Sequence, residues 1–128
     1  MQKIVFAFLM AVVSLFISGL MDASIASAEE VWVYTDSDGK EYYVLTETVR
    51  KEGNGYSWGQ SYSFSFAVDV RILDPKYNYK PYAPEMYFFA YYENTGVWTG
   101  CAGGRERLLN DERHPEYYPI WEVAREYL

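Results

Sequence analysis

Cysteine and histidine are nearly absent, because the chain contains one of each, Cys101 and His114. A single cysteine cannot form a disulfide within the chain, so a disulfide-stapled scaffold is excluded. One histidine and one cysteine also fall short of the four ligands of a zinc site unless carboxylates complete it. We therefore predict no metal site and no cofactor. A lone thiol can be buried, paired with another chain or free and reactive, and we expect burial for Cys101.

Positive charge is also scarce. The sequence has 11 Lys and Arg against 18 Asp and Glu, a formal net charge of −7 at pH 7. Binding to nucleic acid depends on Lys and Arg that neutralise phosphates, and docking on anionic lipid has the same requirement. The composition therefore argues against both, and no glycine-rich phosphate loop, internal repeat or second domain is visible.

A long apolar run occurs only near the N-terminus, from Ile4 to Leu20. Lys3 precedes the run, and Ala26-Ser27-Ala28 provides an A-x-A cleavage site before Glu29, which is the pattern of a secretory signal peptide. The run is shorter than the ~20 residues that a membrane-spanning helix needs. We interpret residues 1–28 as a cleaved signal peptide and expect an exported protein, located in the periplasm, on the cell surface or in the medium. The mature chain is expected to have no membrane span.

Aromatic residues, in contrast, are abundant. The chain has 14 Tyr, 4 Trp and 7 Phe, and every Tyr and Trp lies after residue 28. Aromatic side chains suit strands, and Tyr tolerates both burial and contact with water. Residues 29–128 are therefore expected to form one β-rich domain with an aromatic core, which accounts for most of these rings but not for every tyrosine.

The stretch from Tyr56 to Ile72 has the strongest periodicity in the chain. Every second position carries a large apolar side chain, with Gln60 as the exception: Tyr56, Trp58, Tyr62, Phe64, Phe66, Val68, Val70 and Ile72. Strict alternation predicts a strand with one apolar and one polar face. We expect one unusually long strand, ending at Leu73, with a bend or bulge near Gly59.

An antiparallel hairpin is predicted before this stretch. Val31–Tyr34 and Glu41–Arg50 are rich in Val, Tyr and Thr, and turn-forming residues separate them. Asp36-Ser37-Asp38-Gly39 resembles part of a calcium loop. The first and twelfth positions of such a loop would fall on Tyr34 and Leu45, which lack suitable ligand oxygens. The segment is therefore interpreted as a hairpin turn.

The second half of the mature chain contains two further strands and a closing helix. Met86–Glu93 is apolar on both sides, so both of its faces are expected to be covered, and Val97–Thr99 follows as a strand that can extend through Cys101. Arg105–Asn110 is left open between a strand and a helical turn. Pro119–Leu128 is predicted as a helix that starts at Pro119 and packs one apolar stripe on the sheet. The members of this stripe are Ile120, Val123, Ala124 and Tyr127.

These elements predict an α+β fold. We expect a curved antiparallel sheet of about five to six strands with one C-terminal helix packed against it.

The loop Asp74–Glu85 is the strongest candidate for a binding site. It contains three of the 5 prolines, which exclude a central strand and a helix there. Its tyrosines alternate with lysine, asparagine and proline. Tyrosine offers a large contact area and a hydrogen-bonding tip, and proline reduces the entropy lost when a loop is ordered. We predict a ligand-binding site at Tyr77, Tyr79, Lys80 and Tyr82, with the alternative that these rings fold back and cap an open end of the sheet.

Catalytic signals are weak by comparison. His114 is the only imidazole base and precedes a proline in a charged loop, although Cys101 and His114 could form a thiol–imidazole pair near several glycines. A carboxylate pair needs only proximity, which many acidic residues provide by chance. Asp69 and Arg71 are expected to form solvated or cross-strand ion pairs. We predict no catalytic residue.

The arrangement as a whole is similar to a known family. A signal peptide is followed by Trp32-Val33, Asp38-Gly39, Tyr42-Tyr43-Val44 and Thr46-Glu47-Thr48-Val49-Arg50, and later by Pro119-Ile120-Trp121 with a closing helix. This layout resembles small exported proteins of the surface-adhesin protein E type. The resemblance implies a curved antiparallel sheet with a C-terminal helix, and attachment to extracellular-matrix or serum proteins of a host. A cysteine pair and a basic adhesive segment, other than Lys76 and Lys80, are missing.

We therefore expect an exported, non-catalytic bacterial binding protein, and the resemblance implies an adhesin-like role for it. It would contact a host or envelope protein, or a glycan, through an aromatic surface or the Tyr77–Tyr82 loop. One alternative is a small exported hydrolase that uses Cys101 or a carboxylate pair. Another is an envelope structural or inhibitor protein with a protein partner.

Overall fold

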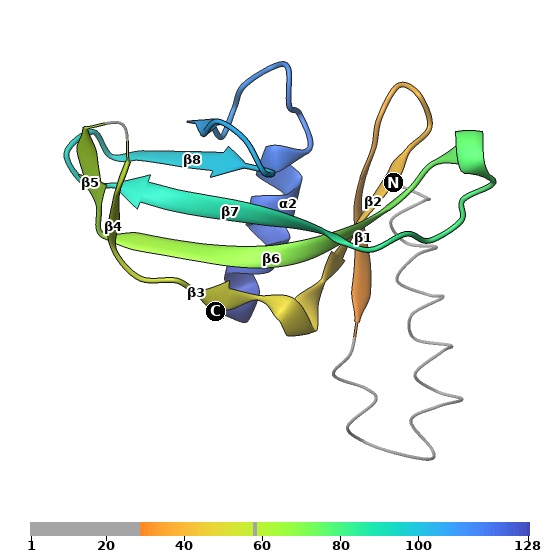
Figure 1. Ribbon diagram of the computed structural model, residues 1–128, viewed down its shortest axis with the longest axis horizontal. Helices are drawn as coiled ribbons and strands as arrows, with labels where there is room; N and C mark the ends of the chain where they lie inside the picture. Colours follow the sequence, from red (N-terminus) through yellow and green to blue (C-terminus); the bar gives the residue numbers. More distant parts are fainter. Residues whose placement is uncertain (1–28, 58) are drawn as a thin grey trace, which may run out of the picture.

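A seven-stranded antiparallel sheet with one helix packed on it dominates the structure, a computed structural model that describes residues 29–57 and 59–128 (Figure 1). The strands follow the spatial order β1-β2-β6-β7-β8-β9, and β3 also pairs with β6. The sheet does not close into a barrel. The predicted α+β class, with its antiparallel sheet and C-terminal helix, is confirmed. The predicted signal peptide, residues 1–28, lies outside the described residues.

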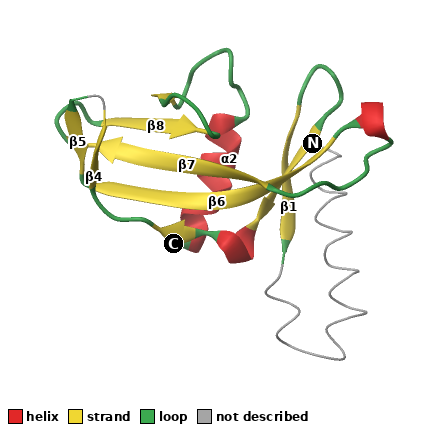
Figure 2. Cartoon of the chain, viewed as in Figure 1, coloured by secondary structure: helices red, strands yellow, loops and turns green. Residues whose placement is uncertain are grey.

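The elements are short, apart from the two central strands (Figure 2). The strands of the large sheet are β1 (Glu30–Thr35), β2 (Glu41–Leu45), β3 (Arg50–Lys51), β6 (Phe64–Leu73), β7 (Glu85–Tyr92), β8 (Val97–Cys101) and β9 (Arg107–Leu108). A separate small sheet pairs β4 (Gly55–Ser57) with β5 (Gln60–Tyr62). The helical elements are η2 (Thr46–Thr48), η3 (Pro75–Tyr77), α2 (Tyr117–Ala124) and η4 (Arg125–Tyr127). No described helix is long and apolar enough to cross a membrane.

The predicted N-terminal hairpin is present as β1 and β2. Its turn is held by the carboxylate of Asp36, which accepts hydrogen bonds of 2.9 Å from the backbone N–H groups of Asp38 and Lys40. The second strand, however, ends at Leu45 and does not continue to residue 50. The hydroxyl of Thr48 donates to the Leu45 carbonyl at 2.7 Å, and this local bond favours the η2 turn over a continued strand.

The prediction of one long strand from Tyr56 to Ile72 is wrong. The chain reverses near Gly59, where φ is +75°, so that β4 and β5 form a hairpin before β6 begins at Phe64. One continuous strand and two strands joined by a tight turn show the same alternation of apolar and polar residues. Gly59 supplies the left-handed backbone conformation that a tight turn needs, in place of the expected bend. Trp58, beside it, lies outside the described residues.

The later elements agree more closely with the sequence pattern. The strand after Asn94-Thr95-Gly96 runs through Cys101, and the undecided segment forms the two-residue strand β9. Helix α2 begins at Tyr117, so Pro119 lies in its first turn and is not its first residue. Proline is tolerated there because the N–H groups of the first turn have no partner within the helix.

The main core lies between α2 and one face of the sheet. It contains Tyr42, Val44, Phe66, Val68, Val70, Tyr87, Phe89, Tyr117, Ile120 and Ala124. Trp98 extends this core, with its ring centroid between 5.4 and 6.0 Å from those of Tyr91, Trp121 and two phenylalanines. Of the predicted helix stripe, Tyr127 is exposed, because the chain has entered η4 by that point.

The opposite face of the sheet is covered at one end by the β4–β5 hairpin. Tyr62 of β5 places its ring edge against Phe88 and Tyr92 of β7, with centroid distances of 5.9 and 5.6 Å. The expectation that β7 is covered on both faces is therefore confirmed from Phe88 to Tyr92, whereas Met86, near the start of the strand, is 49% exposed. Figure 1 shows this hairpin at one end of the sheet and the β6–β7 loop at the other.

Candidate functional site

The β6–β7 loop begins with a single turn of 3-10 helix, η3. The Asp74 carboxylate accepts a hydrogen bond of 2.9 Å from the backbone N–H of Lys76, and Pro75 occupies the start of the turn. The Asp74 carbonyl accepts from the N–H groups of Tyr77 and Tyr79, at 3.0 and 2.9 Å. The prediction that the prolines exclude a helix in this loop is wrong for this turn. Proline is tolerated at the start of a helical turn, because the N–H group that it lacks would have no partner within the turn. The loop therefore has a defined local structure.

Two consecutive residues after this turn have left-handed backbone conformations. The φ angles are +56° at Asn78 and +57° at Tyr79. Asparagine tolerates this region, but a bulky residue such as tyrosine is uncommon there. For such a residue this conformation costs about 1–2 kcal/mol of conformational free energy. Such a conformation persists only when its surroundings hold it, and it is concentrated at functional sites. The backbone places Tyr79 at the turning point of the loop.

All three tyrosine rings of the predicted site are exposed. The exposed fractions are 53% for Tyr77, 47% for Tyr79 and 54% for Tyr82. Tyr77 and Tyr82 meet edge to face with a centroid distance of 5.9 Å, and Lys80 Nζ lies 6.0 Å from the Tyr82 centroid. About half of each ring is therefore in contact with solvent, and the alternative that the rings cap an end of the sheet stays open. Their exposure is what a binding loop requires, and ligand binding by them stays a prediction.

A pocket of about 270 Å³ lies beside these rings. Tyr77 and Tyr82 form part of its wall, and Val70 and Ile72 of β6 provide apolar lining. The charged side chains at this pocket are those of Lys40, Asp74 and Glu85. It therefore combines aromatic, aliphatic and charged groups within a small volume.

Sequence reasoning missed Lys40 as a lining residue. Lys40 lies in the β1–β2 turn, distant in sequence from the loop, and its Nζ lies 3.8 Å from the Asp36 carboxylate. The two segments approach closely, since a Cβ built on Gly39 would lie 3.2 Å from the Pro75 ring. No pattern in the sequence indicates this approach, because it depends on how the hairpin packs against the loop.

The end of the loop is held by Arg71 on β6. Its Nη1 donates to the Tyr82 carbonyl at 3.3 Å, and its Nε lies 3.0 Å from the Glu30 carboxylate on β1. Asp69, two positions earlier, lies 3.5 Å from Arg50 on β3. The expected ion pairs of Asp69 and Arg71 are therefore present and join separate strands. Arg71 also positions the part of the β6–β7 loop that carries Tyr77, Tyr79 and Tyr82, which we call the tyrosine loop.

Cys101 and His114 are not arranged as a nucleophile and its base. Cys101 is half-buried rather than fully buried, and burial, followed by the nearby charge of Glu106, raises the pKa of its thiol. An activated thiol needs the opposite shift. The imidazole of His114 stacks on Tyr117 with a centroid distance of 4.8 Å, and its Nδ1 lies 3.7 Å from Glu116. These contacts favour a structural role for His114.

No relative supplies roles for the residues of this chain, so their geometry alone supports a function. The similarity to surface-adhesin protein E-like proteins stays a prediction. No protein-family model, curated protein or solved structure matches this chain.

Proposed function

We propose that the chain is an exported, non-catalytic bacterial binding protein. Its ligand, a host or envelope protein or a glycan, contacts the tyrosine loop at Tyr77, Tyr79, Lys80 and Tyr82. One observation carries the proposal: three half-exposed tyrosines are presented together on a loop whose backbone is held in place. Isolated apolar side chains are normal on a protein surface, but a group of exposed aromatic rings beside a pocket is typical of an interaction site.

The ordering of the loop supports this role energetically. Association costs free energy when flexible side chains and loops must be immobilised. Asp74 and Arg71 hold the two parts of this loop by hydrogen bonds, and each tyrosine has few rotatable bonds to restrict. A partner can therefore bind the rings without first ordering the backbone beneath them.

Binding is favoured over hydrolysis by the state of the candidate catalytic groups. The thiol of Cys101 has a raised pKa, and His114 contacts Glu116 and Tyr117. Neither arrangement activates a nucleophile.

The test is binding of the purified chain from Glu29 onward to a panel of matrix proteins, serum proteins and glycans. The informative variant is Tyr77→Ala/Tyr79→Ala/Tyr82→Ala. Aromatic hot spots contribute about 2 kcal/mol or more each, so affinity should fall at least about 100-fold. The matched control is Tyr56→Ala/Tyr118→Ala, which removes rings exposed by 71% and 48% elsewhere on the surface.

The proposal requires that the control variant binds as the wild type does and that all variants keep the same circular dichroism spectrum. Binding that survives the triple substitution would move the site away from the loop. Equal losses in both variants would indicate non-specific adhesion by exposed tyrosines. Failure of the wild type to bind any member of the panel would contradict a matrix, serum or glycan ligand.

A further inference from the structure

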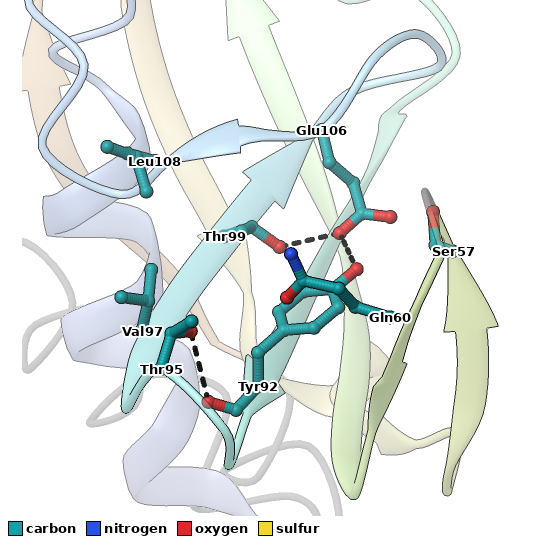
Figure 3. A pocket seen from close by; sticks show the side chains of 8 residues that line it. All are labelled: Ser57, Gln60, Tyr92, Thr95, Val97, Thr99, Glu106 and Leu108. Atoms are coloured by element: carbon teal, nitrogen blue, oxygen red, sulfur yellow. Dashed lines mark hydrogen bonds between the residues drawn. The ribbon is translucent and has the colours of Figure 1, made fainter.

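A second pocket, of about 280 Å³, is drawn in Figure 3. It lies at the end of the sheet where Figure 1 shows the β4–β5 hairpin, away from the tyrosine loop. Val97 and Leu108 contribute apolar side chains to its lining, and Gln60 lines it from the β4–β5 hairpin. The one ionisable carboxyl group in the lining is that of Glu106. We call this cavity the Glu106 pocket. Its volume lies near the lower limit of small-molecule sites, about 300 Å³, so it suits a group of side-chain size.

Two hydrogen bonds from neighbouring strands hold the Glu106 carboxylate in one orientation. The hydroxyls of Tyr92 on β7 and Thr99 on β8 both donate to Glu106 Oε1, each at 2.7 Å. Burial, and then the bond to Glu106, raises the pKa of Tyr92 to about 12, so its hydroxyl stays a donor at neutral pH. The two donors occupy Oε1, and the second oxygen points towards Ser57, which also lines the pocket (Figure 3).

The second oxygen, Oε2, has no cationic partner in the part of the chain that the structure describes. The ion pairs among residues 29–57 and 59–128 do not include Glu106, and Arg107 lies 3.9 Å from Asp111 instead. Glu106 is partly buried beside apolar side chains, and a cation can stabilise a carboxylate in such a place. The net charge of −7 further raises the local concentration of cations around the protein.

We propose that the Glu106 pocket binds an alkylammonium group. The ammonium contacts Glu106 Oε2 beside Ser57, and the alkyl chain extends across the pocket towards Val97 and Leu108, which lie on the other side of Thr99 in Figure 3. An ammonium fits better than a guanidinium, because a guanidinium binds a carboxylate best through both oxygens and Oε1 already accepts two hydrogen bonds. The same group could come from a small free amine or from a lysine side chain of a polypeptide.

A purely structural role for Glu106 makes a different prediction. Glu106 could act only as a link between the segment after β8 and strands β7 and β8. A glutamine can accept the same two hydrogen bonds through its carbonyl oxygen but carries no charge. Glu106→Gln therefore separates the roles: it preserves the link and removes the attraction for a cation.

In the experiment, the protein, in the form that the cell produces, is titrated with each of four probes. Binding is monitored by changes in amide chemical shifts in NMR spectra. The probes are n-hexylammonium, hexan-1-ol, hexanoate and n-butylguanidinium. Saturable shifts on β7 and β8 are expected with n-hexylammonium. Hexan-1-ol and hexanoate should bind at least about tenfold more weakly, because they lack the charge-assisted hydrogen bond. n-Butylguanidinium should also bind more weakly, because Oε1 is already occupied and only one oxygen is left for its two parallel N–H groups. Nα-acetyl-lysine amide then distinguishes the two sources, because it binds only if the pocket accepts a lysine side chain.

Glu106→Gln should weaken n-hexylammonium binding at least about tenfold while its unfolding midpoint stays close to that of the wild type. The matched control is Glu112→Gln, which removes the same charge from an exposed position outside the pocket and should leave affinity unchanged. Equal binding of hexan-1-ol, full binding by Glu106→Gln or equal losses in both variants would overturn the proposal. Absence of saturable shifts with n-hexylammonium would overturn it as well. None of these outcomes depends on the tyrosine loop.

Discussion

At the scale of single residues, close packing decides where a side chain is tolerated. Gly100 lies on β8 and faces Phe89 and Tyr117. A Cβ built there would lie 2.9 Å from the Phe89 ring and 3.4 Å from the Tyr117 ring. A core has no free volume for even one added methyl group at such a position, and its side chains must shift to accept it. Apolar patterning in the sequence gives no sign of this restriction.

Gly100→Ala should therefore destabilise the protein by about 1–3 kcal/mol, because the added methyl overpacks the core. The measurement is the free energy of unfolding from urea denaturation. Gly104→Ala is the matched control, since nothing lies within 4 Å of a Cβ there. Similar losses for the two variants would contradict the packing described between β8 and α2.

Asn78 offers a second test at this scale. Its φ of +56° is tolerated by asparagine and glycine but disfavours a β-branched residue. Asn78→Val should cost about 1–2 kcal/mol or distort the loop and weaken its ligand binding, whereas Asn78→Gly should have a small effect. Urea denaturation and the binding assay measure the two consequences. Equal behaviour of the valine and glycine variants would show that the left-handed turn does not matter.

At the scale of elements, tertiary contacts decide whether the chain near Gly59 continues as one strand or folds back as the β4–β5 hairpin. The pairing within the hairpin is short, and a two-stranded ribbon alone is marginally stable in water. Its docking depends on Tyr62, whose ring contacts Phe88 and Tyr92. The hairpin also supplies Gln60 to the Glu106 pocket, so its docking helps to form that pocket.

Tyr62→Ala should release this hairpin while the large sheet remains folded. Aromatic pairs contribute about 0.5–1.5 kcal/mol each beyond burial, so amide hydrogen exchange in β4 and β5 should accelerate about tenfold or more. Amides of β6 and β7 should keep their protection. Tyr56→Ala, which removes a ring exposed by 71%, is the control. It should leave amide exchange unchanged both in the hairpin and in β6 and β7. Unchanged exchange in β4 and β5 would show that Tyr62 does not hold the hairpin.

At the scale of the whole molecule, tyrosines with raised pKa values connect folding to alkaline pH. Burial is the largest cause in each case, and it raises the pKa values of Tyr43, Tyr92 and Tyr117 to about 12 from a usual 10. The pKa values of Tyr42 and Tyr87 are raised as well, chiefly by burial and then by the charge of Glu116. The aromatic composition therefore has a consequence for the pH range in which the fold is stable.

Stability should be retained below about pH 10 and should fall as the pH rises from 10 towards 12. In that range the unfolded chain releases phenolic protons that the folded protein keeps, so deprotonation favours unfolding. Urea denaturation at several pH values, with tyrosinate absorbance recorded in parallel, measures both changes. Tyr43→Phe should reduce the slope of stability against pH. A constant midpoint from pH 8 to 11 would contradict the role of these buried phenols.

The sequence by itself determined the elements that depend on neighbouring residues. Alternating apolar positions predicted the strand that contains β6, and a continuous apolar run predicted β7. The residues around Asp36 predicted the first hairpin turn, and the stripe at Ile120 and Ala124 predicted the helix. These features are local, because the periods of strand and helix and the chemistry of a turn act over a few residues. The tyrosines of the β6–β7 loop were identified from the sequence for the same reason, as residues of a proline-rich connection, whereas the exposure of their rings was not.

Only the tertiary structure decided the remaining features. The reversal at Gly59, the position of Lys40 beside the tyrosine loop and the convergence of Tyr92, Thr99 and Glu106 all depend on which distant segments pack together. A period-two pattern does not distinguish a strand that continues from one that folds back over the sheet. The physical reason is that burial and hydrogen bonding between distant segments select one arrangement among several that local preferences allow equally.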